Sequence, residues 1–155
     1  MFKKMCLVSL GLIFMISSYA LANIEGAWYT KDDAAIVEIY KDSGSDLFNG
    51  KIVWLKEPKN DDGTDITDNN NPDPAKRSQK RLGLEIVKDF EMKSDNKLRG
   101  GKIYDPENGK TYSCMITLTK NNLLKVRGFI GVSVIGRTEI WTKAENIPAA
   151  LISKD

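Results

Sequence analysis

Residues 112–130 read YSCMITLTKNNLLKVRGFI, and this stretch indicates the fold class. In its first half, every second residue up to Leu118 falls on one mostly apolar face of an extended chain. Lys-Asn-Asn at 120–122 supplies a turn, after which Leu124 and Val126 alternate with basic residues. A period of two is typical of half-buried strands, so the stretch predicts an antiparallel hairpin with one face in a core.

The same alternation recurs along the chain, with turn residues such as Asp-Ser-Gly at 42–44 between the segments. The predicted strands cover residues 26–30, 35–39, 47–55, 84–90, 98–104, 112–118, 124–130 and 135–141. About eight short antiparallel strands joined by tight turns form a meander, and such a meander removes its unpaired edges by closing. We therefore predict an all-β fold, an up-and-down barrel, with a sandwich as the alternative.

The connection 56–82 is long and polar, with an acidic first part and a basic second part. Asp73-Pro74 suits a helix start, which predicts a short helix through Lys80. The loop does not match the EF-hand calcium-binding motif. If Gly63 is the glycine that this motif requires, Pro58 stands at the first ligand position, where an oxygen-bearing side chain is needed. We expect a solvated loop and no metal site, with a non-standard cation site as the alternative.

Residues 1–22 resemble a cleaved secretory signal. Lys3 and Lys4 precede an apolar run over residues 7–16, and Ala-Leu-Ala at 20–22 has the form of a cleavage site. The run is too short for a membrane span, which needs about 20 apolar residues. We expect a periplasmic or secreted protein in which residues 23–155 form one domain, with no transmembrane segment after cleavage.

Composition excludes several functions. The 155 residues contain no histidine, which removes His-dependent triads and His-ligated zinc sites. The 23 basic and 21 acidic residues are balanced, so no nucleic-acid partner is expected. Cys114 lies on the apolar face of its strand, which predicts a buried, inert thiol. We predict a protein that is not an enzyme and has no cofactor.

Aromatic side chains are spread over different strands, where they either fill a small barrel or line a ligand cavity. The candidate ligand-binding residues are Trp54, Tyr40, Tyr104 and Arg127. Alternation leaves the direction of Arg127 ambiguous. On the last strand Arg137 and Trp141 share a face, and a cation–π pair there would plug one barrel end.

Longer segments carry a resemblance. Gly-Ala-Trp at 26–28, together with Arg137 and Trp141, resembles the signature of lipocalin-like (calycin) barrels. The segments GKIVWLKEP, NNNPDP, GGKIYDPENGKTYS and VRGFIGVSVIGRTEIW are similar to the bacterial secreted family of unknown function numbered 2147. This resemblance spans residues 26–141 and implies an exported lipocalin-like barrel, in which Trp28 packs with a late arginine to close the base. It implies no reaction and no catalytic residues.

Two functions follow from these observations. The first is the binding of a small, partly apolar ligand inside the barrel. The alternative is a protein-interaction or envelope-associated module, in which a filled barrel carries loop 56–82 as the surface for an envelope protein partner.

Overall fold

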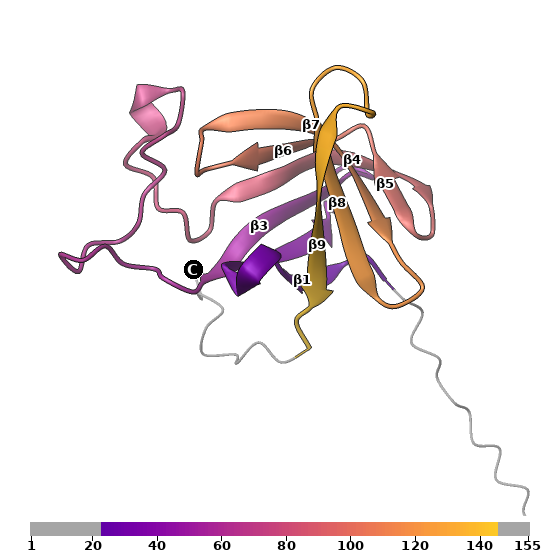
Figure 1. The fold of residues 1–155 in the computed structure, drawn as a ribbon, viewed down its shortest axis with the longest axis horizontal. Helices are drawn as coiled ribbons and strands as arrows, with labels where there is room; N and C mark the ends of the chain where they lie inside the picture. The colour runs from indigo at the N-terminus through magenta and orange to yellow at the C-terminus, as the bar shows by residue number, and fades with distance from the viewer. Residues whose placement is uncertain (1–22, 146–155) are drawn as a thin grey trace, which may run out of the picture.

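The computed structural model describes residues 23–145, and the expected signal peptide lies outside the described residues. The described chain is almost entirely strand (Figure 1). In chain order its elements are β1 (Gly26–Tyr29), η1 (Lys31–Asp33), β2 (Ala35–Lys41), β3 (Phe48–Leu55), η2 (Pro74–Lys76), β4 (Glu85–Ser94), β5 (Lys97–Arg99), β6 (Lys102–Asp105), β7 (Lys110–Leu118), β8 (Leu123–Phe129) and β9 (Gly136–Lys143). No helix within residues 23–145 has the length and apolar character needed to cross a bilayer.

The strands close into one antiparallel barrel. Strands that follow one another in sequence pair with each other, except β5 and β6, which each pair with β4 and β7. β1 pairs with β9 through Trp28 opposite Lys143, which closes the sheet. The predicted 112–126 hairpin is present, with Ile116 opposite Val126 in the β7–β8 register. Closure pairs the edge strands, which confirms the predicted barrel over the sandwich.

One predicted strand is divided. Residues 98–104 were expected to be continuous, but β5 and β6 are separated by Gly100 and Gly101 and together fill one position between β4 and β7. Gly100 has a φ of +82°, which glycine adopts without strain. A Cβ on Gly101 would lie 2.1 Å from Cδ2 of Phe90, so only glycine fits there. The barrel thus has eight strand positions and nine strand segments.

One end of the barrel, which we call the base, is filled. Trp28 is 1% exposed and donates from Nε1 to the carbonyl oxygen of Ile24 at 2.8 Å. Lys143 Nζ lies 4.3 Å from the centre of the Trp28 ring and donates to the carbonyl oxygen of Glu25 at 2.8 Å. Burial lowers the pKa of this lysine. The cation that closes the base is therefore Lys143, which corrects the expectation that Arg137 serves this role.

Apolar side chains complete the filling of the base. Phe90, Leu98, Ile116 and Leu124 are each 0% exposed and belong to one cluster with Trp28. They point inward because alternate residues of a strand face the same side of a sheet. The other end of the barrel, which we call the mouth, holds the β6–β7 turn and the β8–β9 loop.

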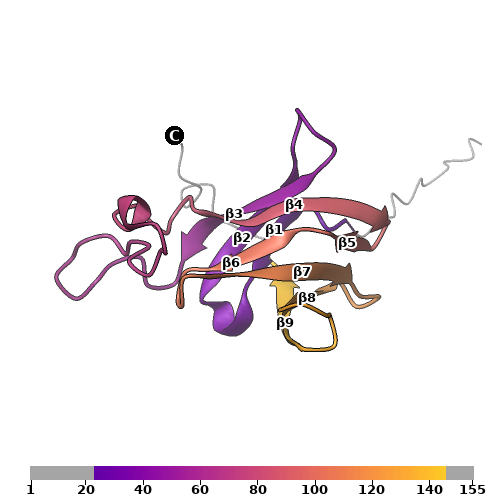
Figure 2. The ribbon, with the colours of Figure 1, turned by 90° about the horizontal axis from the view of Figure 1, so that it is seen from above.

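The long connection 56–82 extends from one side of the barrel (Figure 2). The predicted helix is shorter than expected: Asp73 caps η2 by accepting from the amide of Ala75 at 3.0 Å, but η2 ends at Lys76. Beyond it the chain turns back, and Lys80 forms a bridge with Thr67. This pairing within the loop ends the helix before Lys80.

Candidate ligand-binding cavity

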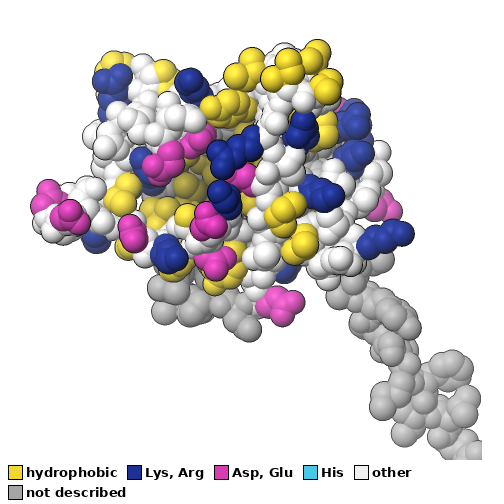
Figure 3. Space-filling view, viewed as in Figure 1, with side chains coloured by type: hydrophobic (Ala, Val, Ile, Leu, Met, Phe, Trp, Pro, Cys, Tyr) yellow, Lys and Arg dark blue, Asp and Glu magenta, His cyan; other side chains and the backbone are white. Residues whose placement is uncertain are grey.

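The mouth half of the barrel is hollow. A cavity of about 800 Å³ opens between β9, η1 and the β6–β7 turn (Figure 3). Its apolar floor comes from five strands. The floor side chains are Ile52 of β3, Ile86 of β4, Ile103 of β6, Val126 of β8 and Trp141 of β9. An apolar pocket of this size is suited to a small organic molecule.

The space exists partly because Gly128 has no side chain. Gly128 lies on β8 opposite Arg137 and lines the cavity. A Cβ added there would meet Tyr112 Cβ at 3.6 Å and Ile103 Cγ2 at 3.7 Å, which are ordinary contacts. A larger side chain at position 128 would therefore extend into the cavity.

Two charged side chains of β9 line the cavity. Arg137 lies at the rim and Glu139 lies deeper, between Arg137 and Trp141 on the same face of the strand. Among the described residues neither forms an ion pair within 4.0 Å. Glu139 accepts only a long 3.4 Å hydrogen bond from Trp141 Nε1. Both charged groups are therefore available to a polar group of a ligand.

Tyr104 lines the cavity with its ring, but its hydroxyl has a partner. It donates at 2.7 Å to Oδ1 of Asp68. Asp68 is 0% exposed, and its other carboxylate oxygen, Oδ2, accepts from Asn71 Nδ2 at 2.6 Å. Burial, and next the hydrogen bond to Asp68, raise the pKa of Tyr104 to about 12. This hydroxyl holds the long loop against the barrel, so the ring is the part of Tyr104 that faces a ligand.

A second contact fastens the loop to the rim. Arg81, whose side chain is only 12% exposed, donates to the Thr67 and Pro106 carbonyls at 3.1 Å each and pairs with Glu107. Asn70 Nδ2 adds a 2.8 Å bond to the carbonyl of Glu107. Residues 66–82 thus fix the β6–β7 turn that forms one wall of the mouth. Because Asp68 and Arg81 look like ordinary loop residues, sequence reasoning did not single them out.

Tyr40 and Trp54 do not line the cavity, which corrects their expected place inside the barrel. Both point outward: Tyr40 donates to Glu85 Oε2 at 2.9 Å, and Trp54 packs edge-on to Tyr29 with ring centres 6.1 Å apart. Trp54 and Tyr29 belong to a separate apolar cluster around Ile36. In β3 a register shift opposite Ile36 and Val37 breaks strict alternation, so Trp54 does not share the inward side of Ile52.

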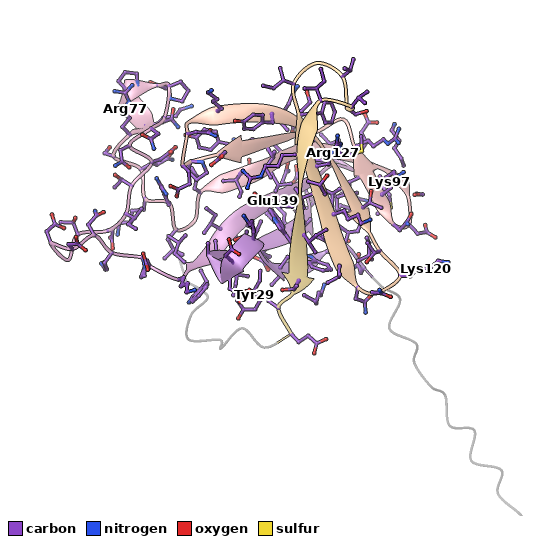
Figure 4. All side chains as sticks on the ribbon, viewed as in Figure 1. Tyr29, Arg77, Lys97, Lys120, Arg127 and Glu139 are labelled. Atoms are coloured by element: carbon purple, nitrogen blue, oxygen red, sulfur yellow. The ribbon has the colours of Figure 1, made fainter. Side chains whose placement is uncertain are left out.

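Arg127 also lies outside the cavity, next to the β8–β9 loop (Figure 4). Its guanidinium donates to the carbonyls of Ser133 at 2.8 Å and Val134 at 3.1 Å, and to Thr138 Oγ1 at 3.0 Å. Its inward-facing neighbours on β8 are Val126 and Gly128. Arg127 therefore fixes the loop instead of facing the interior.

Cys114 is 2% exposed, as predicted, and burial raises the pKa of its thiol to about 12.

In the acidic part of loop 56–82, Lys59 and Lys80 both pair with Asp65 and lower its pKa to about 2. Within residues 23–145 no three side chains of the His, Cys, Asp or Glu type gather as a metal site would require. The basic half of the loop thus neutralises part of its acidic half.

Comparison with known proteins agrees with this architecture. One solved structure, described as "Protein HP1028 from the human pathogen Helicobacter pylori belongs to the lipocalin family", superposes with a TM-score of 0.68 at 22% identity, covering 80% of this chain and 84% of that chain. The likeness shows a lipocalin-like fold. No curated protein matches the sequence. The model of a family described as "Uncharacterized protein conserved in bacteria (DUF2147)" matches residues 26–143, which include every strand of the barrel, and the chain therefore belongs to this family.

Proposed function

We propose that this protein binds a small, partly apolar molecule in the mouth half of its barrel. The observation that carries the proposal is the cavity of about 800 Å³, whose floor is apolar and whose wall carries Glu139 and Arg137. Pockets that bind small molecules combine these two features, an apolar lining and a few placed polar groups.

The arrangement orients such a ligand. Its apolar part would lie on Ile103, Val126 and Trp141, where contact removes apolar surface from water. Its polar end would lie toward the rim, within reach of the carboxylate of Glu139 and the guanidinium of Arg137. A ligand that carries a polar or charged group at one end fits this division of the cavity better than a pure hydrocarbon.

The role we propose is binding without turnover, in the periplasm or outside the cell. The signal-like sequence of residues 1–22 supports export. The absence of histidine supports binding over catalysis, because the commonest general base is missing from the chain.

Native mass spectrometry of the protein purified from its own host under mild conditions tests the proposal. We expect a discrete added mass that leaves on denaturation and whose value is unchanged after long incubation. Gly128→Leu should lower the fraction of protein that carries the added mass, because the leucine side chain takes up part of the cavity. Lys125→Leu, which adds the same side chain to the outer face of β8, should keep it.

A wild-type protein without added mass would contradict the proposal, and so would a Gly128→Leu variant that carries as much adduct as wild type. A bound molecule that is converted to a product during incubation would contradict binding without turnover.

A further inference from the structure

The loop between β8 and β9, residues 130–135, exposes four large apolar side chains. The exposed fractions are 69% for Ile130, 60% for Val132, 83% for Val134 and 70% for Ile135. Figure 3 shows yellow side chains gathered over this loop at the top of the molecule. Clustered exposed apolar residues of this kind mark a surface that contacts something other than water.

The loop is held in a defined shape. Arg127 donates to two of its carbonyls, at Ser133 and Val134, and to Thr138 just beyond it. The amide of Ile135 also donates to the carbonyl of Val132 at 3.1 Å. The valines at the tip are therefore presented to solvent by specific contacts, although water is an unfavourable environment for them.

The charged residues nearest the loop along the sequence are cations, and the first acidic residue beyond it, Glu139, lines the cavity. Between Leu123 and Thr138 the charged residues are Lys125, Arg127 and Arg137, and none is acidic. None of the three forms an ion pair within 4.0 Å in the described part of the chain. An apolar tip flanked by uncompensated cations complements a bilayer surface that carries anionic headgroups.

The loop is also continuous with the cavity. Ile130 and Ile135 line the cavity wall while remaining exposed, whereas Val132 and Val134 point away from it. An apolar path thus leads from the loop tip to the cavity floor. A protein seated on a membrane by this loop would have its mouth directed at the lipid surface.

We propose that the β8–β9 loop docks the barrel on an anionic phospholipid surface, with Val132 and Val134 entering the interface and Arg127 and Arg137 facing the headgroups. The docking does not depend on what occupies the cavity. The valines can be altered without touching the cavity lining, so a failure of docking is distinguishable from a failure of ligand binding.

The test is co-sedimentation of residues 23–155 with vesicles. This chain contains every strand of the barrel and omits the apolar N-terminal stretch, which would bind lipid by itself. We compare vesicles of phosphatidylcholine with vesicles of phosphatidylcholine and phosphatidylglycerol in equal parts. Binding is expected on the anionic vesicles, weakened by high salt.

The double variant Val132→Ser/Val134→Ser should lower partitioning onto anionic vesicles by about tenfold or more, because it removes the apolar groups that enter the interface. The matched control is Met92→Ser/Ile140→Ser, which removes two exposed apolar side chains elsewhere on the barrel and should partition as wild type does. Circular dichroism checks that both variants are folded.

Three results would overturn the docking proposal. The first is a wild-type protein that stays in solution with both kinds of vesicle. The second is equal loss of binding in the two double variants. The third is a dimer, seen by light scattering, that the Val132→Ser/Val134→Ser variant dissociates, because a second copy of the chain would then cover the loop.

Discussion

The base and the mouth of this barrel use the same strands in opposite ways. At the base, Trp28, Phe90 and Ile116 fill the interior completely and are at most 1% exposed. Toward the mouth, the inward positions of the same sheet carry Gly128, Glu139 and Arg137, and they leave a cavity of about 800 Å³. One closed sheet therefore combines a packed core that supplies stability with an open half that costs stability and is available for a ligand.

The charged side chains at the two ends of the barrel make the same distinction. At the base, Lys143 lies over the Trp28 ring and donates to a backbone carbonyl, so its charge is used inside the fold. At the mouth, Arg137 and Glu139 form no ion pair within the described residues, although they lie on the same strand and the same face as Lys143. The difference separates a structural charge from charges that can meet a ligand.

The largest expected difference in stability is between alanine substitutions of two isoleucines, one in the filled base and one beside the cavity. Ile116→Ala removes a side chain that is 0% exposed at the base and should lower the free energy of unfolding by about 3–4 kcal/mol. Ile103→Ala removes a half-buried side chain beside open space and should cost about 1 kcal/mol, because it only enlarges an existing cavity. Urea unfolding measures both. Equal losses would mean that the mouth is packed as tightly as the base.

Alanine substitutions of two glycines, one beside the filled base and one beside the cavity, should differ less in their effect on stability. Gly101→Ala places a Cβ within 2.1 Å of the buried Phe90 ring and should cost about 2–3 kcal/mol. Gly128→Ala meets nothing closer than 3.6 Å and should change stability by about 0.5 kcal/mol or less. Thermal unfolding followed by circular dichroism compares the two variants. A Gly128→Ala variant as unstable as Gly101→Ala would show that no space exists at the mouth.

The smallest effect concerns the contact that holds the mouth in shape. Tyr104→Phe leaves the buried Asp68 carboxylate without one donor and should cost about 1–2 kcal/mol. Tyr40→Phe is the control, because its partner Glu85 is partly exposed and water can replace the lost bond. Urea unfolding at neutral pH should show a loss in the first variant and little change in the second.

The same tyrosine predicts a pH dependence. Its pKa is raised from 10.0 to about 12 in the folded protein, so the unfolded chain loses this proton first. Its contribution to stability is therefore fully present below about pH 10 and is lost as the pH rises toward 12. The alkaline loss of stability should be shallower in Tyr104→Phe than in wild type. An unchanged slope would show that the Asp68 contact does not hold in solution.

Sequence reasoning reached the fold because the information for it is local. Alternation along residues 112–130 and the turns between segments identify strands and their inward faces, as Cys114 and Ile116 show. It failed where two elements distant in sequence decide the outcome. The division of β5 from β6 depends on Phe90 pressing against Gly101, and the outward direction of Trp54 depends on a register shift between β2 and β3.

From the sequence, the cavity was one of two alternatives: aromatic side chains that fill the barrel, or aromatic side chains that line a ligand cavity. Alternation placed Arg137 and Trp141 on one face, but it could not tell which level of the barrel is filled. That depends on the summed volumes of side chains from several strands. The hydrogen bonds that Asp68 and Arg81 make with the barrel depend on where the long loop folds back against it. No local sequence pattern determines that position.

The central claim is that the base of the barrel is filled and the mouth binds a ligand. The most direct test is to titrate residues 23–155 with the small apolar probe N-phenyl-1-naphthylamine and to follow the isoleucine methyl signals by NMR. We expect shifts at Ile52, Ile86 and Ile103, which line the cavity, and unchanged signals at Ile24 and Ile39 in the filled base. A spectrum without shifts at the three cavity methyls, or with shifts at the base methyls instead, would contradict the claim.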